Sequence, residues 1–310
     1  MPILDVLAPV FLLIALGVAL QRSRFVSPTF LLEANRVTYW LGLPALLFSQ
    51  LASSFHEIGE ARLMLGAMFA GTLGAIGAGY LGARLQRVPG ASTGTYVHGA
   101  MRGNLAFVGL PIIFALPDQP VAGGLTLRAA AILIVAPMMV SYNVGGVVVL
   151  LLSQHAAGWR MIRPFAKQLV TTPPLIATVA GIVFALAGWR LPAAIDKTFA
   201  ALGEMALPLG LLGVGGSLVT VRLGTAWPHP LGSALVKTLV SPALGWAFGR
   251  WLGLGAVELK VIMILMACPT AIVSYTMAVE MKGDVALASG TIICSVLCSV
   301  VTLAVIVGAF

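Results

Sequence analysis

Arg102, Gly103 and Asn104 place a permanent positive charge, a glycine and a polar amide inside a segment that is apolar and long enough to cross a bilayer. In hydrocarbon, an interrupted helix is stable only where protein encloses the break or the break lines a polar cavity, because its backbone groups otherwise lack hydrogen bonds. A guanidinium at that depth is typical of a substrate or ion pathway. The sequence therefore predicts a broken helix whose break belongs to a binding site.

A second interruption lies far downstream, at Cys268, Pro269 and Thr270. Two interrupted segments in corresponding positions are typical of the substrate sites of transporters. Each break starts a new half-helix, and its N-terminal end carries roughly half a positive charge, which favours an anion. Arg102 can also hold a carboxylate through two parallel hydrogen bonds. The predicted substrate-binding residues are Arg102, Gly103, Asn104, Cys268, Pro269, Thr270, Ser274, Tyr275 and Asn143.

Three further ionisable residues are candidates for ion coupling or charge compensation: His98, Lys237 and Glu204. His98 either titrates near neutral pH or remains a neutral, hydrogen-bonded side chain. Lys237 either compensates charge, pairs with Glu280 or extends its ammonium to the membrane surface. Glu204 either carries a proton or packs between helices near an outer vestibule. Arg102 and Asn143 have structural alternatives too, since the first can extend to the membrane surface and the second can bridge two helices.

Composition points to the class of protein. Charged residues make up 9% of the chain, against about 25% in a soluble domain, and hydrophobic residues make up 59%. Apolar runs of about 20 residues, which suffice to span a bilayer, recur along the whole chain. The ten runs that we predict as membrane segments 1 to 10 are 3–20, 34–53, 61–84, 95–117, 126–152, 167–187, 197–218, 230–253, 258–280 and 285–309. The predicted fold class is an all-α polytopic membrane protein.

The net charge of +8 follows the loops and does not indicate a nucleic-acid partner. Arginine and lysine are more frequent in the odd-numbered loops than in the even-numbered ones. By the positive-inside rule, the odd loops are cytoplasmic and both termini are periplasmic, in a bacterial cytoplasmic membrane. No spacing of His, Cys, Asp and Glu predicts a metal site, and no motif predicts a cofactor or an enzyme active site.

The two halves of the chain resemble each other. Pro9 corresponds to Pro173, and Pro44 to Pro208, both at an offset of 164 residues that also aligns the apolar runs. Each half has an odd number of spans, so the second half must be inserted upside down. This predicts a 5+5 inverted repeat, with residues 1–152 and 167–310 as repeats and 153–166 as a cytoplasmic linker. The broken segments 4 and 9 are expected to cross.

A set of short motifs, in this order and spacing, resembles a bacterial member of the auxin efflux carrier family, similar to malonate and malate permeases. The motifs are Leu43-Pro44-Ala45-Leu46-Leu47-Phe48, Arg102-Gly103-Asn104, Gly109-Leu110-Pro111, Cys268-Pro269-Thr270-Ala271 and Asp284-Val285-Ala286-Leu287-Ala288-Ser289. The resemblance implies the fold of bile-acid/sodium symporters, with segments 1, 2, 6 and 7 as a scaffold and segments 3–5 and 8–10 as a mobile transport core. It also implies a homodimer through the scaffold helices.

The resemblance further implies elevator-type transport of small organic anions, with Pro44, Pro111 and Pro208 as bends or hinges. Plant members carry an Asn-Pro motif at the first crossover, whereas this chain has no proline beside Asn104, so auxin is not the expected substrate. We expect sodium-independent transport, because the only acidic residues that we count in the core segments, Glu258 and Glu280, lie at segment ends. The alternatives are a ten-helix exporter of other metabolites or drugs, which does not require paired broken helices, and a passive channel.

Overall fold

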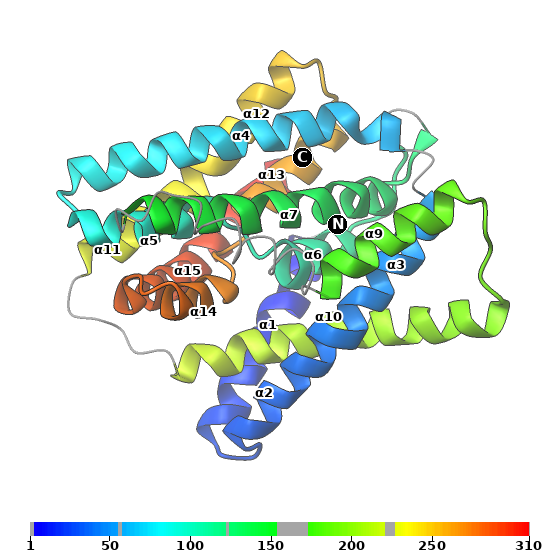
Figure 1. Ribbon diagram of the computed structural model, residues 1–310, viewed down its shortest axis with the longest axis horizontal. Coiled ribbons are helices and arrows are strands. Elements are labelled where there is room, and N and C mark those ends of the chain that lie inside the picture. The colour runs from blue at the N-terminus through cyan, green and yellow to red at the C-terminus, as the bar shows by residue number, and fades with distance from the viewer. Residues whose placement is uncertain (1–2, 55–57, 122–123, 154–172, 221–226, 310) are drawn as a thin grey trace. The chain divides into compact units, whose positions relative to one another are not determined.

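The computed structural model describes residues 3–54, 58–121, 124–153, 173–220 and 227–309. In these ranges every regular element is helical, apart from two isolated β-bridges (Figure 1). Five stretches of helix are long and apolar enough to cross a membrane: Ala61–Leu85, Leu127–Ser153, Ala193–Gly216, Pro228–Trp251 and Val285–Ala309. Residues 154–166, nearly all of the predicted linker, lie outside the described ranges.

The contacts within the chain divide it into two compact units. Unit 1 includes residues 106–139, which form most of a π-helical turn, η3, then α6 and the first half of α7. Its other elements are those of predicted segments 1, 2, 6 and 7. They are α1 (Ile3–Arg22), α2 (Pro28–Val37), η1 (Thr38–Gly42), α3 (Leu43–Ser54), α9 (Pro173–Leu186) and α10 (Ala193–Thr220). The family resemblance implies another grouping, in which segments 4 and 5 belong to a transport core.

Unit 2 contains most of α4 (Ile58–Leu85), the second half of α7 (Leu127–Ser153) and both helix breaks. Its remaining elements are α5 (Gly90–Met101), α11 (Pro228–Leu235), η6 (Val236–Val240), α12 (Ser241–Trp251), α13 (Ala256–Ala267), α14 (Val273–Glu280) and α15 (Val285–Ala309). The first break lies between α5 and η3 (Leu105–Gly109), which continues into α6 (Leu110–Ala115). The second lies between α13 and α14, so both predicted interruptions are present.

Glycines let the helices of unit 1 approach each other closely. A Cβ added to Gly17 would lie 2.2 Å from the carbonyl oxygen of Leu212, and one added to Gly215 would lie 1.9 Å from that of Ile14. α1 and α10 therefore pack backbone against backbone at two points, as small residues allow in membrane helices. On α3, Phe48 packs edge-on against Phe184 of α9, with ring centroids 5.4 Å apart.

In unit 2, glycines likewise let α4 and α12 approach each other closely. A Cβ on Gly71 would lie 3.2 Å from the Cα of Gly245, and the side chain of Met266 on α13 fills the space beside both glycines. On α5, Gly99 lies against the side chains of Thr291 and Ser233. The absence of side chains at these positions brings α5, α11 and α15 together around the first break.

After each of the three π-helical turns, the second residue is a proline. η1 is followed by Leu43-Pro44, η3 by Leu110-Pro111 and η6 by Ser241-Pro242. Proline lacks an amide hydrogen, and its ring clashes with the carbonyl four residues earlier in a regular helix. A wider turn before the proline gives the ring more room. In η6, accordingly, the N–H of Ser241 donates to the carbonyl of Val236, five residues back.

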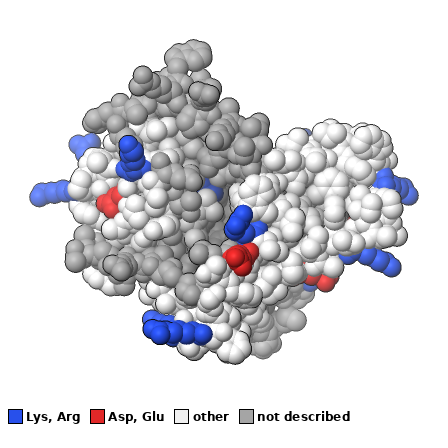
Figure 2. All heavy atoms as spheres, turned by 60° about the horizontal axis from the view of Figure 1, so that its bottom comes forward, with Lys and Arg blue, Asp and Glu red and all other residues white. Residues whose placement is uncertain are grey.

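The described surface is largely uncharged. On the face drawn in Figure 2, acidic and basic side chains are few, and most of the described surface is uncharged. Large apolar side chains are exposed on helices of both units, for example Leu12, Val183 and Val301. Such a surface matches hydrocarbon rather than water.

Candidate binding site at the paired helix breaks

The two breaks of unit 2 bond to each other through their backbones. Gly103 and Thr270 form an antiparallel β-bridge, beside which the N–H of Asn104 donates to the carbonyl of Pro269 at 2.8 Å. The N–H of Ala271 donates to the carbonyl of Arg102 at 3.2 Å. Each break thus supplies hydrogen-bond partners for the other, which is what an interrupted helix needs away from water.

Thr270 ties the second break to two neighbouring helices. Its hydroxyl donates to the carbonyl of Gly99 on α5 at 2.8 Å, and its N–H donates to the hydroxyl oxygen of Ser295 on α15 at 2.9 Å. Ser295 was not among the predicted site residues. Its signal was the spacing of Thr291, Ser295 and Ser299, which places three small polar side chains on one face of an apolar helix; all three are fully buried.

The side chain of Arg102 is enclosed and held by α7 and α14. Its Nη2 donates to Oδ1 of Asn143 at 2.7 Å, and its Nη1 lies 3.5 Å from the carbonyl of Tyr142 and 3.2 Å from Sδ of Met277. Arg102 is only 7% exposed. The guanidinium therefore lies beside the break instead of extending to a surface, and Asn143, predicted as a substrate ligand, orients it.

Lys237 brings a second cationic side chain to the breaks. It is fully buried, and its ammonium donates to the carbonyl of Met266 in the last turn of α13. A Cβ on Gly103 would lie 3.2 Å from the same nitrogen, so the glycine makes room for it. The C-terminal end of a helix carries partial negative charge, which a cation stabilises. Extension of this ammonium to the membrane surface is therefore a wrong expectation, and the side chain of Glu280 lies outside the described residues.

Two buried polar side chains near Arg102 have unsatisfied hydrogen-bonding capacity. Within the described part of the chain, neither ring nitrogen of His98 has a hydrogen-bond partner, and neither has the hydroxyl of Ser274. The alternative of a hydrogen-bonded His98 therefore has no protein partner within these residues. Its ring lies against Gly146 of α7, where a Cβ would be 2.6 Å from Nε2. Buried polar groups are usually satisfied by protein, water or ligand.

The remaining predicted site residues are placed less centrally. Cys268 is fully buried, and its thiol donates to the carbonyl of Ile264 at 3.1 Å. Tyr275, next to Ser274, is 36% exposed. Glu204 is exposed and belongs to unit 1. Among the described residues, no three His, Cys, Asp or Glu side chains gather as a metal site would require.

The predicted bends take two forms. Pro44 and Pro111 each lie near the start of a helix that follows a π-helical turn, whereas Pro208 lies inside the continuous helix α10. A helix with an internal proline loses one backbone hydrogen bond. Pro242, which follows η6 in the same way, was not among the predicted bends.

Comparison with known proteins agrees with this architecture. The sequence matches the family described as membrane transport protein twice, over residues 2–159 and 149–307. A protein of Methanothermobacter thermautotrophicus described as an uncharacterized transporter is 26% identical over 272 residues, which cover 87% of this chain and 85% of that relative. An uncharacterized transporter of Methanocaldococcus jannaschii is 22% identical over 274 residues, covering 83% of this chain and 82% of the relative.

The matches span nearly the whole chain, and they meet near residues 149–159, where the two predicted repeats meet. The matches and the long apolar helices identify the chain as a transporter and not an enzyme. The paired breaks are parts of that transporter. The chain is an all-helical, multi-pass membrane protein and belongs to the membrane transport protein family, that of the auxin efflux carriers.

Proposed function

We propose that this protein is a secondary active transporter of small organic anions, mono- or dicarboxylates such as malonate or malate, in the bacterial cytoplasmic membrane. The observation that carries the proposal is the enclosed guanidinium of Arg102 beside the paired breaks. Asn143 and the Tyr142 carbonyl accept hydrogen bonds from the guanidinium and orient it. A planar guanidinium held in this way suits a carboxylate.

The electrostatics around Arg102 favour an anion further. Lys237 places an ammonium next to Gly103, and η3 and α14 begin just after the breaks, where helix N-termini attract negative charge. The unsatisfied hydroxyl of Ser274 and the imidazole of His98 supply neutral groups for orientation. A carboxylate therefore gains charge compensation and hydrogen bonds from the same few residues.

The proposed architecture is ten membrane segments in a 5+5 inverted repeat, with the broken segments crossing. Its support is the order of elements, because a helix, a break and a short helix precede a long helix in both halves: α5, η3–α6 and α7, then α13, α14 and α15. The elevator mechanism is supported by the division of the chain, in which segments 1, 2, 6 and 7 fall in unit 1 and both breaks fall at or within unit 2. We further propose periplasmic termini and a homodimer through the scaffold helices.

The proposed transport does not need sodium. Hard cations select sites rich in oxygen ligands, usually with carboxylates, whereas the breaks hold the cationic groups of Arg102 and Lys237. These groups compensate the anion directly, and net movement follows the substrate gradient or a co-transported proton.

The test is counterflow in proteoliposomes. Vesicles loaded with unlabelled malonate or malate should accumulate the labelled anion transiently, which a passive channel does not produce. A thermal-shift series with mono- and dicarboxylates should rank the same anions, because ligands that bind the folded state raise its apparent stability. Counterflow of neutral or cationic metabolites with no response to carboxylates would favour the exporter instead.

A further inference from the structure

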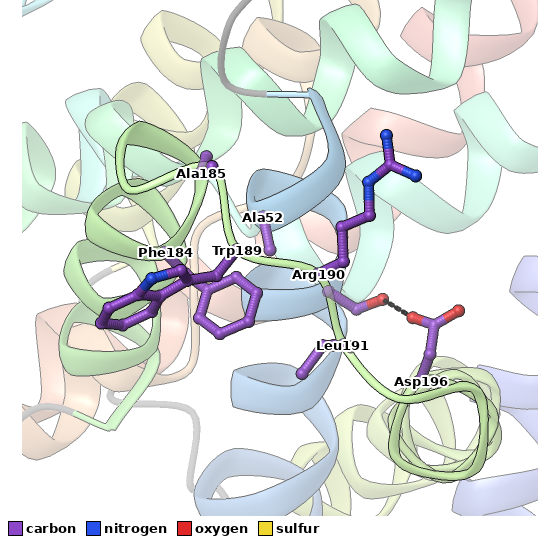
Figure 3. A pocket seen from close by; sticks show the side chains of 9 residues that line it. Ala52, Phe184, Ala185, Trp189, Arg190, Leu191 and Asp196 are labelled. Atoms are coloured by element: carbon purple, nitrogen blue, oxygen red, sulfur yellow. Dashed lines mark hydrogen bonds between the residues drawn. The ribbon is translucent and has the colours of Figure 1, made fainter.

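Unit 1 contains a pocket of about 490 Å³ at the end of α9 and the start of α10. Phe184 and Trp189 form one side of it, and Asp196 lies on the other, with Arg190 on the connecting segment between them (Figure 3). Both ionic side chains are exposed. The pocket thus combines an aromatic wall with one positive and one negative group, and none of these residues takes part in the site at the breaks.

The two charges of the pocket do not neutralise each other. Asp196 accepts a hydrogen bond of 3.2 Å from the hydroxyl of Ser49 on α3, and in Figure 3 the guanidinium of Arg190 is directed away from this carboxylate. Within the described residues no ion pair joins Arg190 to Asp196. Opposite charges held apart at one pocket fit a ligand that itself carries both signs.

The aromatic wall fits a ligand at the membrane interface. Trp189 packs edge-on against Phe184, with ring centroids 5.5 Å apart and an interplanar angle of 77°, and remains 61% exposed. Tryptophan is enriched where hydrocarbon meets water, and the face of its ring attracts ammonium groups. The neighbouring Arg190 has the chemistry to bind a phosphate.

An exposed apolar stripe runs along α9, the helix that ends at this pocket. Its members recur at intervals of three or four residues, which places them on one face of a helix. They are Ile176, Val179, Val183 and Leu186, with exposed fractions of 50%, 54%, 53% and 66%. The stripe ends three residues before Trp189, so the pocket lies where the apolar, exposed part of α9 ends, at the level of lipid headgroups.

We propose that this pocket binds the headgroup of a zwitterionic phospholipid with an ethanolamine head. The phosphate contacts Arg190, the ammonium lies between the carboxylate of Asp196 and the ring of Trp189, and the acyl chains extend into the bilayer. This inference does not depend on the anion proposed for the breaks.

The experiment is native mass spectrometry of the full chain, released from detergent with equal amounts of phosphatidylethanolamine and phosphatidylglycerol. The wild type should retain phosphatidylethanolamine preferentially. Asp196→Asn should reduce that preference about fivefold, the effect of losing one exposed charge contact. Arg190→Gln should instead weaken the retention of both lipids by a similar factor, because both carry the phosphate that Arg190 contacts. Lys197→Gln is the matched control, because it removes an adjacent exposed charge that does not line the pocket.

Three outcomes would overturn the proposal. Equal retention of both lipids would show that the headgroup is not recognised. Unchanged preference in Asp196→Asn, together with unchanged retention in Arg190→Gln, would place the lipid elsewhere. Lipid loss that follows only the dissociation of a dimer would assign this surface to a second copy of the chain. Glycerophosphoethanolamine, added as a competitor without acyl chains, should displace the lipid weakly; full displacement would identify a site for a free zwitterion and contradict the role of the acyl chains.

Discussion

The side-chain oxygen of Asn143 lies 2.7 Å from Nη2 of Arg102, so an uninterrupted helix holds the charge that stands at a helix break. A residue at the end of α5 has no further helical turn to fix its side chain. Asn143, in the middle of α7, supplies that constraint from outside. The direction of the guanidinium is therefore set by α7. Substitutions of Arg102 test the role of its charge, and substitutions of Asn143 test the role of its orientation.

Arg102→Ala should reduce carboxylate uptake into proteoliposomes by about a hundredfold or more, because removing one partner of an enclosed charge pair costs several kcal/mol of binding. Arg102→Lys should restore only part of the uptake, since a lysine lacks the bidentate geometry. Arg128→Ala is the control, because Arg128 bonds to the carbonyl of Phe114 in unit 1. A folded Arg102→Ala protein with wild-type uptake would contradict the proposed role.

Asn143→Asp should weaken anion uptake while the protein remains folded. The new carboxylate would occupy the position of Oδ1, 2.7 Å from the guanidinium, and would compete with the substrate for its charge. The expected loss is at least about tenfold in the apparent affinity for the anion, with no decrease in melting temperature. Asn143→Ser, which keeps a neutral acceptor, should lose much less. Equal uptake by Asn143→Asp and wild type would show that the anion does not meet Arg102.

Lys237→Met should lower both uptake and stability. Methionine fills a similar volume but leaves the Met266 carbonyl without its ammonium donor, and an unsatisfied buried carbonyl costs about 1–3 kcal/mol. The melting temperature and anion counterflow are the measurements. Lys260→Met, on a less buried part of α13, should change neither. A more stable and fully active Lys237→Met protein would mean that the ammonium is dispensable at the break.

Gly215→Ala should destabilise unit 1, because its Cβ would lie 1.9 Å from the carbonyl oxygen of Ile14. Separation of α1 from α10 is expected to lower the free energy of unfolding by about 1–3 kcal/mol. Gly77→Ala on α4 is the matched control, since nothing lies within 4 Å of a Cβ there. Equal melting temperatures of the two variants would disprove the backbone contact between α1 and α10.

Uptake should be unchanged when sodium is replaced by potassium or choline at constant pH. The ammonium of Lys237 and the guanidinium of Arg102 already bring positive charge to the breaks, which disfavours a nearby cation. The measurement is the initial rate of labelled malonate uptake with each salt at one ionic strength. A strict sodium requirement would show that the carbonyls at the breaks bind the ion despite these groups.

The breaks themselves could be predicted because glycine, proline and a charge in an apolar run leave few structures open to the backbone. The partners of the charges could not, since they depend on register between helices. Lys237 donates to the backbone carbonyl of Met266, and every residue has such a carbonyl, so the residue type does not indicate the contact. His98 lies against Gly146, which has no side chain that could indicate a partner. The assignment of residues 106–139 to unit 1 likewise follows packing that hydropathy does not encode.

The π-helical turn η6 accommodates one residue more than a regular helix would need at this point. A continuous α-helix of the same residues from Pro228 to Trp251, without this wider turn, would have the same hydropathy. It would also rotate α11 by about 100° around the helix axis relative to α12. Lys237 and the face that α11 turns toward α5 and α15 could then not both keep their places. In this helix the count of residues, and not only their chemistry, decides where the positive charge lies.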